Sequence, residues 1–246
     1  MKALVISDVH SNICALQAIQ KEESDSDIIY CAGDLVDYGP FPKEVIEWIR
    51  DHEIVTVKGN HDEDVINAYR QGKTLSDIPE EERRWVDHNA DQLDDKHIEF
   101  LERLPEHVSF TLDGYAYAMK HRFGQNYETV DNAVEFRQFW SACQSGSAHD
   151  QTLHPEKRGI FGHTHLQAIH YVTNDELWLN PGSVSYRKKQ KIDHSRDAQY
   201  MTITNGKIDI KSVEYDMRPM QKAFHAIKLS EQQFQASRRI FEEVEE

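Results

Sequence analysis

The sequence, 246 residues long, predicts an α/β protein. Two observations carry this prediction: strand-like apolar runs alternate with helical patterns over residues 1–60, and two hairpin signals mark a strand-rich second half. Alternation of this kind builds a parallel sheet through right-handed crossovers. The chain has no internal repeat and no linker rich in Pro, Gly or Ser. One large domain is therefore the simpler interpretation, since this length suits one large or two small domains.

Strands and helices alternate in the N-terminal part. Short apolar runs bounded by polar residues predict buried strands over residues 2–7, 27–32 and 53–57. Helical spacing predicts helices over residues 12–23 and 42–50, and the second of these opens on Pro42. From residue 62 to residue 104 the apolar positions recur at helical spacing. We expect this stretch to be helical.

The second half is dominated by strands. Asp113-Gly114 and Asn205-Gly206 are strong hairpin turn signals, so strands are expected on either side of each, over residues 107–112, 115–120, 201–204 and 207–213. Shorter strands are expected over residues 159–162, 168–173 and 177–179. Helices are expected over residues 128–140 and 229–244, with a surface loop over residues 141–156.

Composition excludes several classes of protein. Lys and Arg total 28 against 43 Asp and Glu, for a formal charge of -15, which disfavours binding to duplex nucleic acid and to anionic membranes. The 3 cysteines form no Cys-x-x-Cys pair, which suits a reducing compartment. No stretch resembles a signal peptide or a membrane span. We expect a soluble cytoplasmic protein.

The residues that can carry chemistry stand directly after predicted strands. They are Asp8 and His10, Asp34 and Asp37, Asn60 and His61, His121, and His163 and His165. Ligands of open α/β sheets bind beyond the carboxyl ends of the strands. These side chains are therefore expected to point into one crevice.

Seven of them form a set of metal donors: Asp8, His10, Asp34, Asn60, His121, His163 and His165. Two carboxylates, one amide and four imidazoles suit Mn, Fe, Zn or Co, and seven donors exceed what one ion takes. Two ions that share a bridging carboxylate would use the whole set. The spacing fits as well, because Asp8 and His10 would face the same way in an extended chain, as would His163 and His165.

The order of these motifs resembles the calcineurin-like metallophosphoesterase superfamily. The chain carries Asp-x-His, Gly-Asp-x-x-Asp-x-Gly, Gly-Asn-His-Asp, a single His and Gly-His-x-His in this order, and the Asn-Pro-Gly-Ser at residues 180–183 resembles the compact bacterial and archaeal branch. The resemblance covers residues 1–216 and implies a sandwich of two packed mixed β-sheets flanked by helices. Residues 217–246 would form a helical extension, packed on this domain or on a partner subunit.

The resemblance also implies a division of labour among the site residues. Asp8, His10 and His165 would hold one metal, Asn60, His121 and His163 a second, and Asp34 would bridge both. His61 would be the catalytic histidine, oriented by Asp37. The ions would be divalent transition metals, Mn first and Fe, Zn, Co or Ni as alternatives, and a hydroxide bridging them would attack phosphorus in line.

Two basic residues are candidates for substrate binding. The branch usually shows His-Gly-Ser where this chain has His121-Arg122-Phe123-Gly124. The guanidinium of Arg122 suits a phosphate clamp, and a plain surface role is the alternative. Arg187 belongs to a basic run at residues 186–191, which would either steer a long anionic substrate or form a solvated loop. Tyr38 and Asp62 replace the Arg and Glu of the superfamily's protein phosphatases, which disfavours that activity.

The sequence thus predicts a metal-dependent phosphoesterase acting on a small phosphorylated substrate. Phosphodiesters, including dinucleoside polyphosphates and cyclic nucleotides, are the substrates that we expect first. A phosphomonoesterase or protein phosphatase is the alternative, followed by a non-catalytic scaffold with the same fold. A nuclease is disfavoured by the acidic charge. The sequence leaves open whether the chain forms a homo-oligomer.

Overall fold

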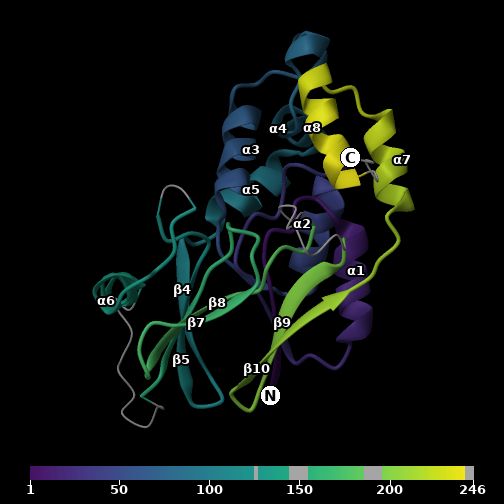
Figure 1. The fold of residues 1–246 in the computed structure, drawn as a ribbon. Coiled ribbons are helices and arrows are strands. Elements are labelled where there is room, and N and C mark those ends of the chain that lie inside the picture. The colour runs from purple at the N-terminus through teal and green to yellow at the C-terminus, as the bar shows by residue number, and fades with distance from the viewer. Residues whose placement is uncertain (125–126, 144–154, 186–195, 242–246) are drawn as a thin grey trace.

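The computed structural model describes residues 1–124, 127–143, 155–185 and 196–241. Its strands are β1 (Lys2–Ile6), β2 (Ile28–Cys31), β3 (Val55–Thr56), β4 (His107–Leu112), β5 (Tyr115–Lys120), β6 (Lys157–Ile160), β7 (Ala168–Tyr171), β8 (Glu176–Asn180), β9 (Ala198–Thr204) and β10 (Lys207–Val213). They form two sheets of five strands, in the orders β10-β9-β1-β2-β3 and β4-β5-β6-β8-β7 (Figure 1).

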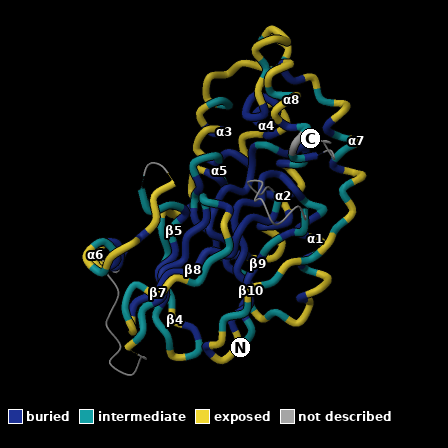
Figure 2. Tube along the Cα trace, viewed as in Figure 1, coloured by how far each residue is buried: buried dark blue, intermediate teal, exposed yellow. Residues whose placement is uncertain are grey.

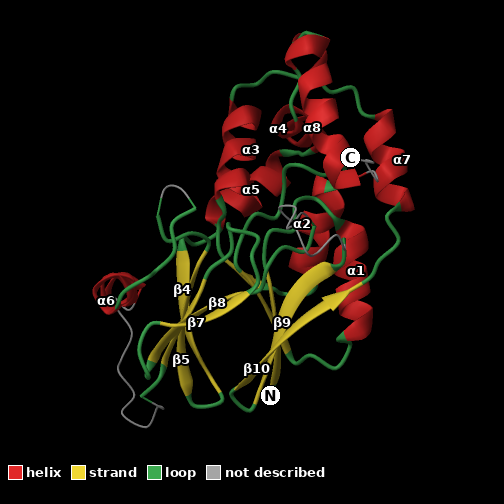
Figure 3. Ribbon diagram, viewed as in Figure 1, coloured by secondary structure: helices red, strands yellow, loops and turns green. Residues whose placement is uncertain are grey.

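Both sheets mix parallel and antiparallel pairs. In the first, β1, β2 and β3 run parallel and β9 pairs antiparallel with β1. In the second, β5, β6 and β8 run parallel, while β4 and β7 are antiparallel strands at the two edges. The predicted sandwich of two mixed sheets flanked by helices is confirmed (Figure 3).

The α-helices gather mainly at one end of the sandwich (Figure 3). They are α1 (Ile13–Glu22), α2 (Pro42–Asp51), α3 (Asn60–Arg70), α4 (Trp85–Gln92), α5 (Asp95–Arg103), α6 (Ala133–Cys143), α7 (Arg218–Ala226) and α8 (Glu231–Phe241). Within the described residues, no helix is long and apolar enough to cross a membrane.

Strand β1 is apolar from Ala3 to Ile6 because both of its faces are buried there, as are the strands in the middle of the molecule in Figure 2. Side chains alternate along a strand, so Leu4 and Ile6 join one core with the helices, whereas Ala3 and Val5 join the core between the two sheets. The core between the sheets also contains Met119 of β5. An uninterrupted apolar run is what a strand buried on both faces requires.

The predicted hairpins are confirmed, and their turns have the backbone that the sequence indicates. Asp113 and Gly114 have φ of 51° and 83°, and Asn205 and Gly206 have φ of 50° and 78°. Asn, Asp and Gly adopt this left-handed conformation most readily. Turns with this backbone match the right-handed twist of the two strands that they connect.

Some element boundaries differ from the prediction. Strand β3 is only 2 residues long, and α6 begins at Ala133 rather than at residue 128. Of the expected surface loop at 141–156, residues 144–154 lie outside the described residues. The C-terminal part contains α7 in addition to the helix predicted at 229–244, and Pro219 lies in the first turn of α7, where its missing N–H loses no hydrogen bond.

Helices α7 and α8 pack against α4 of the same chain. Trp85 of α4 shares an apolar cluster with Met220, Phe224 and Phe241. The Trp85 indole N–H also donates a hydrogen bond of 2.6 Å to Ser237 Oγ. Tyr38 packs against the same cluster, so the C-terminal helices reach the loop that follows β2.

A buried carboxylate connects α1 to the first sheet. Glu23 caps α1 and is 4 % exposed. Its oxygens lie 2.6 Å from Lys2 Nζ and 2.8 Å from Lys211 Nζ, and Tyr200 donates to it at 2.8 Å. Burial by itself would raise the pKa of Glu23, but the hydrogen bonds from Lys2, Lys211 and Tyr200 outweigh it and lower the pKa.

We expect Glu23→Gln to lower the free energy of unfolding at pH 7 by about 1–3 kcal/mol, because the two ammonium groups lose their buried acceptor. Since folding lowers the pKa of Glu23, its contribution is complete above the ordinary pKa of about 4.3 and is lost as the pH falls toward the folded value. Urea unfolding at pH 7 and pH 4 should therefore show a smaller pH effect in the variant. The exposed neighbour Glu22, changed to Gln, is the control, and an equal loss in both variants would contradict this account.

Candidate metal centre

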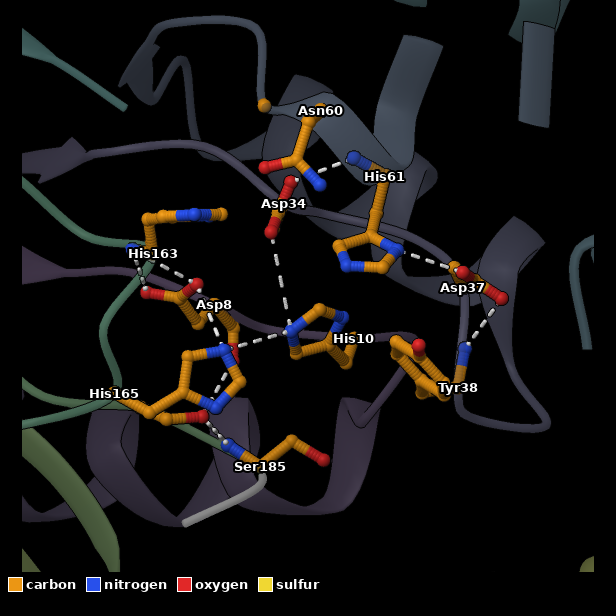
Figure 4. A network of polar contacts seen from close by, with 12 residues as sticks. Asp8, His10, Asp34, Asp37, Tyr38, Asn60, His61, His163, His165 and Ser185 are labelled. Atoms are coloured by element: carbon orange, nitrogen blue, oxygen red, sulfur yellow. Dashed lines mark hydrogen bonds and ion pairs between the residues drawn. The ribbon is translucent and has the colours of Figure 1, made fainter. Parts of the chain in front are cut away.

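The residues that follow five strands lie together at the carboxyl ends of those strands, and Figure 4 shows those that follow β1, β2, β3 and β6. They are Asp8 and His10 after β1, Asp34 and Asp37 after β2, Asn60 and His61 after β3, His121 after β5, and His163 and His165 after β6. The structure brings together all seven side chains predicted as metal ligands. The predicted His61–Asp37 pair lies beside them.

The first group of donors is Asp8, His10 and His165, all three buried. Nε2 of His165 lies 3.1 Å from Asp8 Oδ1 and 3.3 Å from Nε2 of His10. These donor atoms all lie within 4.8 Å of one another. The side chains come from β1 in one sheet and β6 in the other, so this group joins the two sheets.

The second group is Asp34, His121 and His163, with Asn60 beside it. Nε2 of His121 lies 3.0 Å from Asp34 Oδ2 and 3.1 Å from Asn60 Oδ1. The same Asp34 oxygen lies 4.0 Å from His10 Nε2 in the first group. Asp34 therefore faces both groups from between them.

The groups have the properties of cation sites. Asp34 Oδ2 is buried, and the nitrogens that face it are Nε2 of His121 at 3.0 Å and Nε2 of His10 at 4.0 Å. The Nε2 atoms of His10 and His165 face each other, and a shared cation would use both lone pairs. Carboxylate, amide and imidazole donors suit divalent transition metals. The residues present fit two such ions.

Burial keeps two of the imidazoles neutral, which is the form that binds metals. It lowers the pKa of His10 to about 3. Burial, helped by the charge of His121, lowers the pKa of His163 to about 4. Burial also opposes the charge of His121, but the carboxylates of Asp34 and Asp8 outweigh it and raise the pKa of His121 to about 9. Metal binding at the second group would therefore release a proton.

His61 and Asp37 form a hydrogen-bonded pair at the edge of the two groups (Figure 4). Nδ1 of His61 lies 2.7 Å from Asp37 Oδ2, and the His61 ring is centred 5.1 Å from that of His10. Burial acts against the charged imidazole, but the hydrogen bond to Asp37 and the carboxylate of Asp34 raise the pKa of His61 to about 9. His61 can thus hold a proton beside the donors.

The backbone that presents these ligands is not extended, so the expectation drawn from the two-residue spacings is wrong. Asp8 and His10 have φ of 54° and 46°, and His163 and His165 have φ of 63° and 58°. The N–H groups of Val9 and His10 both donate to the carbonyl of Asp34, at 2.8 and 3.1 Å. This pairing between loops holds the left-handed conformation, which is unfavourable by about 1–2 kcal/mol per residue.

Glycines of the motifs let the loops approach the carboxylates. A Cβ at Gly59 would collide with the Asp34 side chain, and one at Gly162 would collide with Ser7 and Asp8. These glycines therefore provide close packing around the ligands rather than contacts of their own.

Asp62 is a positioning residue to which the sequence analysis assigned no role. Its carboxylate is buried and accepts hydrogen bonds from the N–H groups of Leu35, Val36 and Gly59, at 2.8, 3.2 and 2.8 Å. It joins the loop that carries Asp34 to the start of α3. The signal was present in Gly59-Asn-His-Asp62, which has the spacing of a helix capping box.

Asn89 of α4 is a second positioning residue that the sequence analysis missed. It is buried, and its Oδ1 accepts from Ser11 Oγ at 2.6 Å and from the Asp37 N–H at 3.0 Å. Its Nδ2 donates to the carbonyls of Gly39 and Trp85. All four hydrogen bonds of this amide are used, and three of them hold the loops behind His10 and Asp37 to α4. An Asn inside a helix carries no sequence signal of such a role.

For the phosphoesterase activity that the sequence predicts, we expect Asn89→Ala to lower kcat by about 10- to 100-fold with little change in KM, because the Asp37 loop loses its support and His61 its orientation. In an Asp37→Asn background the same substitution should have little further effect on kcat, since it acts through Asp37. Steady-state kinetics of the two single variants and the double variant measure this. Additive losses would contradict the role, and Asn174→Ala, at an exposed turn, is the control.

Arg122 lies beside the second group. It lines a pocket of about 230 Å³ together with Asn60 and His121. Its charge is one of the influences that lower the pKa of His163, after burial and the charge of His121. Arg187 and the basic run at 186–191 lie outside the described residues. The ring of Tyr127, which the sequence analysis did not single out, stacks on His163 at 4.9 Å.

Comparisons with known proteins show similarity over nearly the whole chain. An archaeal relative, the uncharacterized protein MJ0912 of Methanocaldococcus jannaschii, is 28% identical over 233 residues, which are 91% of this chain and 90% of the relative. The crystal structure of a metallophosphoesterase from Sphaerobacter thermophilus has a TM-score of 0.69 and 24% identity, covering 96% of this chain and 100% of that one. The hypothetical protein PH1004 of Pyrococcus horikoshii OT3 also has a TM-score of 0.69, with 15% identity and coverage of 96% and 97%.

The family model of the calcineurin-like phosphoesterase superfamily domain matches residues 1–204, which include all seven donors and the His61–Asp37 pair. The two structural similarities show a shared fold over nearly the whole chain. The resemblance inferred from the motifs is thereby confirmed, and the chain belongs to the calcineurin-like phosphoesterase superfamily.

Proposed function

We propose that this protein is a metal-dependent phosphoesterase that hydrolyses small phosphodiesters, with nucleotide-type compounds as the first candidates. One observation carries the proposal: two groups of metal donors face each other across Asp34, with a hydrogen-bonded His61–Asp37 pair at their edge. We place this activity in residues 1–216, with residues 217–246 as an extension.

Asp8, His10 and His165 would hold one divalent cation, and Asn60, His121 and His163 the other, with Asp34 shared between them. We propose Mn²⁺ as the metal, on the chemistry of the oxygen and nitrogen donors. Such a pair of ions supplies Lewis acidity toward phosphoryl oxygens and lowers the pKa of water bound to it.

His61 would act as the acid of the reaction. Its Nδ1 is taken by Asp37, so Nε2 is left to hold a proton for the leaving oxygen of the ester. Asp37 fixes the ring and stabilises its positive charge. The backbone N–H of His61 donates a hydrogen bond of 2.9 Å to Asp34 Oδ1, which connects the proposed acid to the ligand shared by both donor groups.

A phosphomonoesterase is the second candidate, because the same donors can serve a monoester. Tyr38 stands where the protein phosphatases of the superfamily carry Arg, and its ring lies 4.8 Å from that of His61. A tyrosine at this place has no guanidinium to bind a phosphate, which disfavours the protein phosphatase. A non-catalytic scaffold would not need the complete donor set or the His61–Asp37 pair. The diesterase therefore remains the first choice.

The test compares bis(p-nitrophenyl) phosphate with p-nitrophenyl phosphate as substrates of the Mn²⁺-loaded protein. We expect kcat/KM to favour the diester by about tenfold or more, which corresponds to about 1.4 kcal/mol of transition-state binding. A preference of the same size for the monoester would replace the diesterase with the phosphomonoesterase.

A further inference from the structure

A pocket of about 230 Å³ opens beside the second group of donors, and two of those donors, Asn60 and His121, form part of its wall. Three segments build it: the start of α3, the turn before β4, and residues 120–124 after β5. It is smaller than the roughly 300–1,000 Å³ typical of sites for whole drug-sized ligands. A pocket of this size suits one further chemical group of a substrate held at the metal donors.

The pocket concentrates positive charge in an acidic protein. The whole chain has 28 basic and 43 acidic residues, whereas the pocket is lined by three basic residues, Lys58, Lys120 and Arg122, and two acidic ones, Glu63 and Glu106. The basic residues are half-buried and the two glutamates are exposed. The balance of charge is thus reversed at this place, and the basic residues are the less exposed of the charged groups.

The ammonium group of Lys58 has donors to offer. Nζ of Lys58 gives one hydrogen bond, of 3.2 Å, to the carbonyl of Glu102, and an ammonium group has three donors. The guanidinium of Arg122 suits phosphate oxygens in a two-point contact. The exposed carboxylates at the rim can accept hydrogen bonds from sugar hydroxyls, as acidic residues do in dinucleotide sites.

We propose that this pocket binds a second phosphate group of the substrate, so that the preferred substrates are esters with two linked phosphates rather than simple diesters. The inference rests on the proposed phosphoesterase function and names the substrate class of the same site. The scissile phosphate occupies the donor groups, and the adjoining phosphate lies among Lys58, Lys120 and Arg122, with its sugar toward Glu63 and Glu106.

The test uses two substrates that differ by one phosphate: the p-nitrophenyl esters of adenosine 5′-monophosphate and of adenosine 5′-diphosphate. We expect the wild-type protein to have a kcat/KM about tenfold or more higher for the diphosphate ester, a size typical of one charge-assisted contact. In Lys58→Met and Arg122→Met this preference should largely vanish, mainly through a higher KM for the diphosphate ester. Arg122→Lys, which keeps the charge, should restore part of it.

Lys43→Met is the matched control, because Lys43 is an exposed lysine on α2 whose one ion pair within the described residues is with Glu47. It should keep the wild-type preference. Equal kcat/KM values for the two esters in the wild-type protein, or an unchanged preference in both pocket variants, would overturn the inference. Hydrolysis of neither ester by the metal-loaded protein would instead count against the proposed function.

Discussion

Replacement of Asp34 by Asn should remove metal binding and phosphoesterase activity together. Asp34 Oδ2 lies 3.0 Å from His121 Nε2 and 4.0 Å from His10 Nε2, so one carboxylate serves both donor groups. An amide in its place loses the negative charge and can turn an N–H toward the site. We expect kcat/KM to fall by about 10²–10⁴-fold, since each metal contributes several kcal/mol of transition-state stabilisation.

The measurement pairs metal analysis by mass spectrometry with kinetics on bis(p-nitrophenyl) phosphate. Asp51→Asn, an exposed residue at the end of α2, should keep wild-type metal content and rate. An Asp34→Asn protein that is fully active without bound metal would contradict the proposed role of Asp34.

Replacement of His61 by Ala should separate activity from metal binding. His61 hydrogen-bonds Asp37 and belongs to neither donor group, so its loss removes the proposed proton donor while the ligands stay in place. General acid catalysis contributes about 10²–10⁴-fold, and kcat should fall by that amount. The loss should be greatest for substrates whose leaving alcohol is a weak acid, because these depend most on protonation.

His52→Ala is the control for this variant, since His52 is exposed and its hydrogen bonds in the described part of the chain are to Trp48 and Gln20. Metal content and melting temperature are measured beside kcat. If His61→Ala lost its metals in proportion to its activity, His61 would be a structural support of the donor groups and not the acid.

Much of the fold could be predicted because the sequence pattern and the burial agree. Residues 3–6 of β1 are an unbroken apolar run because Leu4 and Ile6 face the helices while Ala3 and Val5 face the second sheet. The hairpins at Asp113-Gly114 and Asn205-Gly206 could be predicted since these residues adopt positive φ readily. Local residue preference and tertiary structure point the same way at these places.

The donor residues could be placed together for a similar reason, because parallel strands end at a common edge. Their backbone could not be predicted. Asp8 and His10 are held at positive φ by hydrogen bonds to the carbonyl of Asp34, a contact between segments far apart in the sequence. The role of Asn89 could not be predicted for the same reason, since its partners Ser11 and Asp37 are distant in the chain. Long-range contacts leave no periodic signal.

The central claim is tested most directly by stripping the protein with a chelator and returning Mn²⁺ while the hydrolysis of bis(p-nitrophenyl) phosphate is followed. We expect no turnover without metal and a saturable rise that is complete at about two Mn²⁺ per chain. Turnover that survives complete removal of metal would contradict the claim, and so would a protein that neither binds the metal nor hydrolyses the ester.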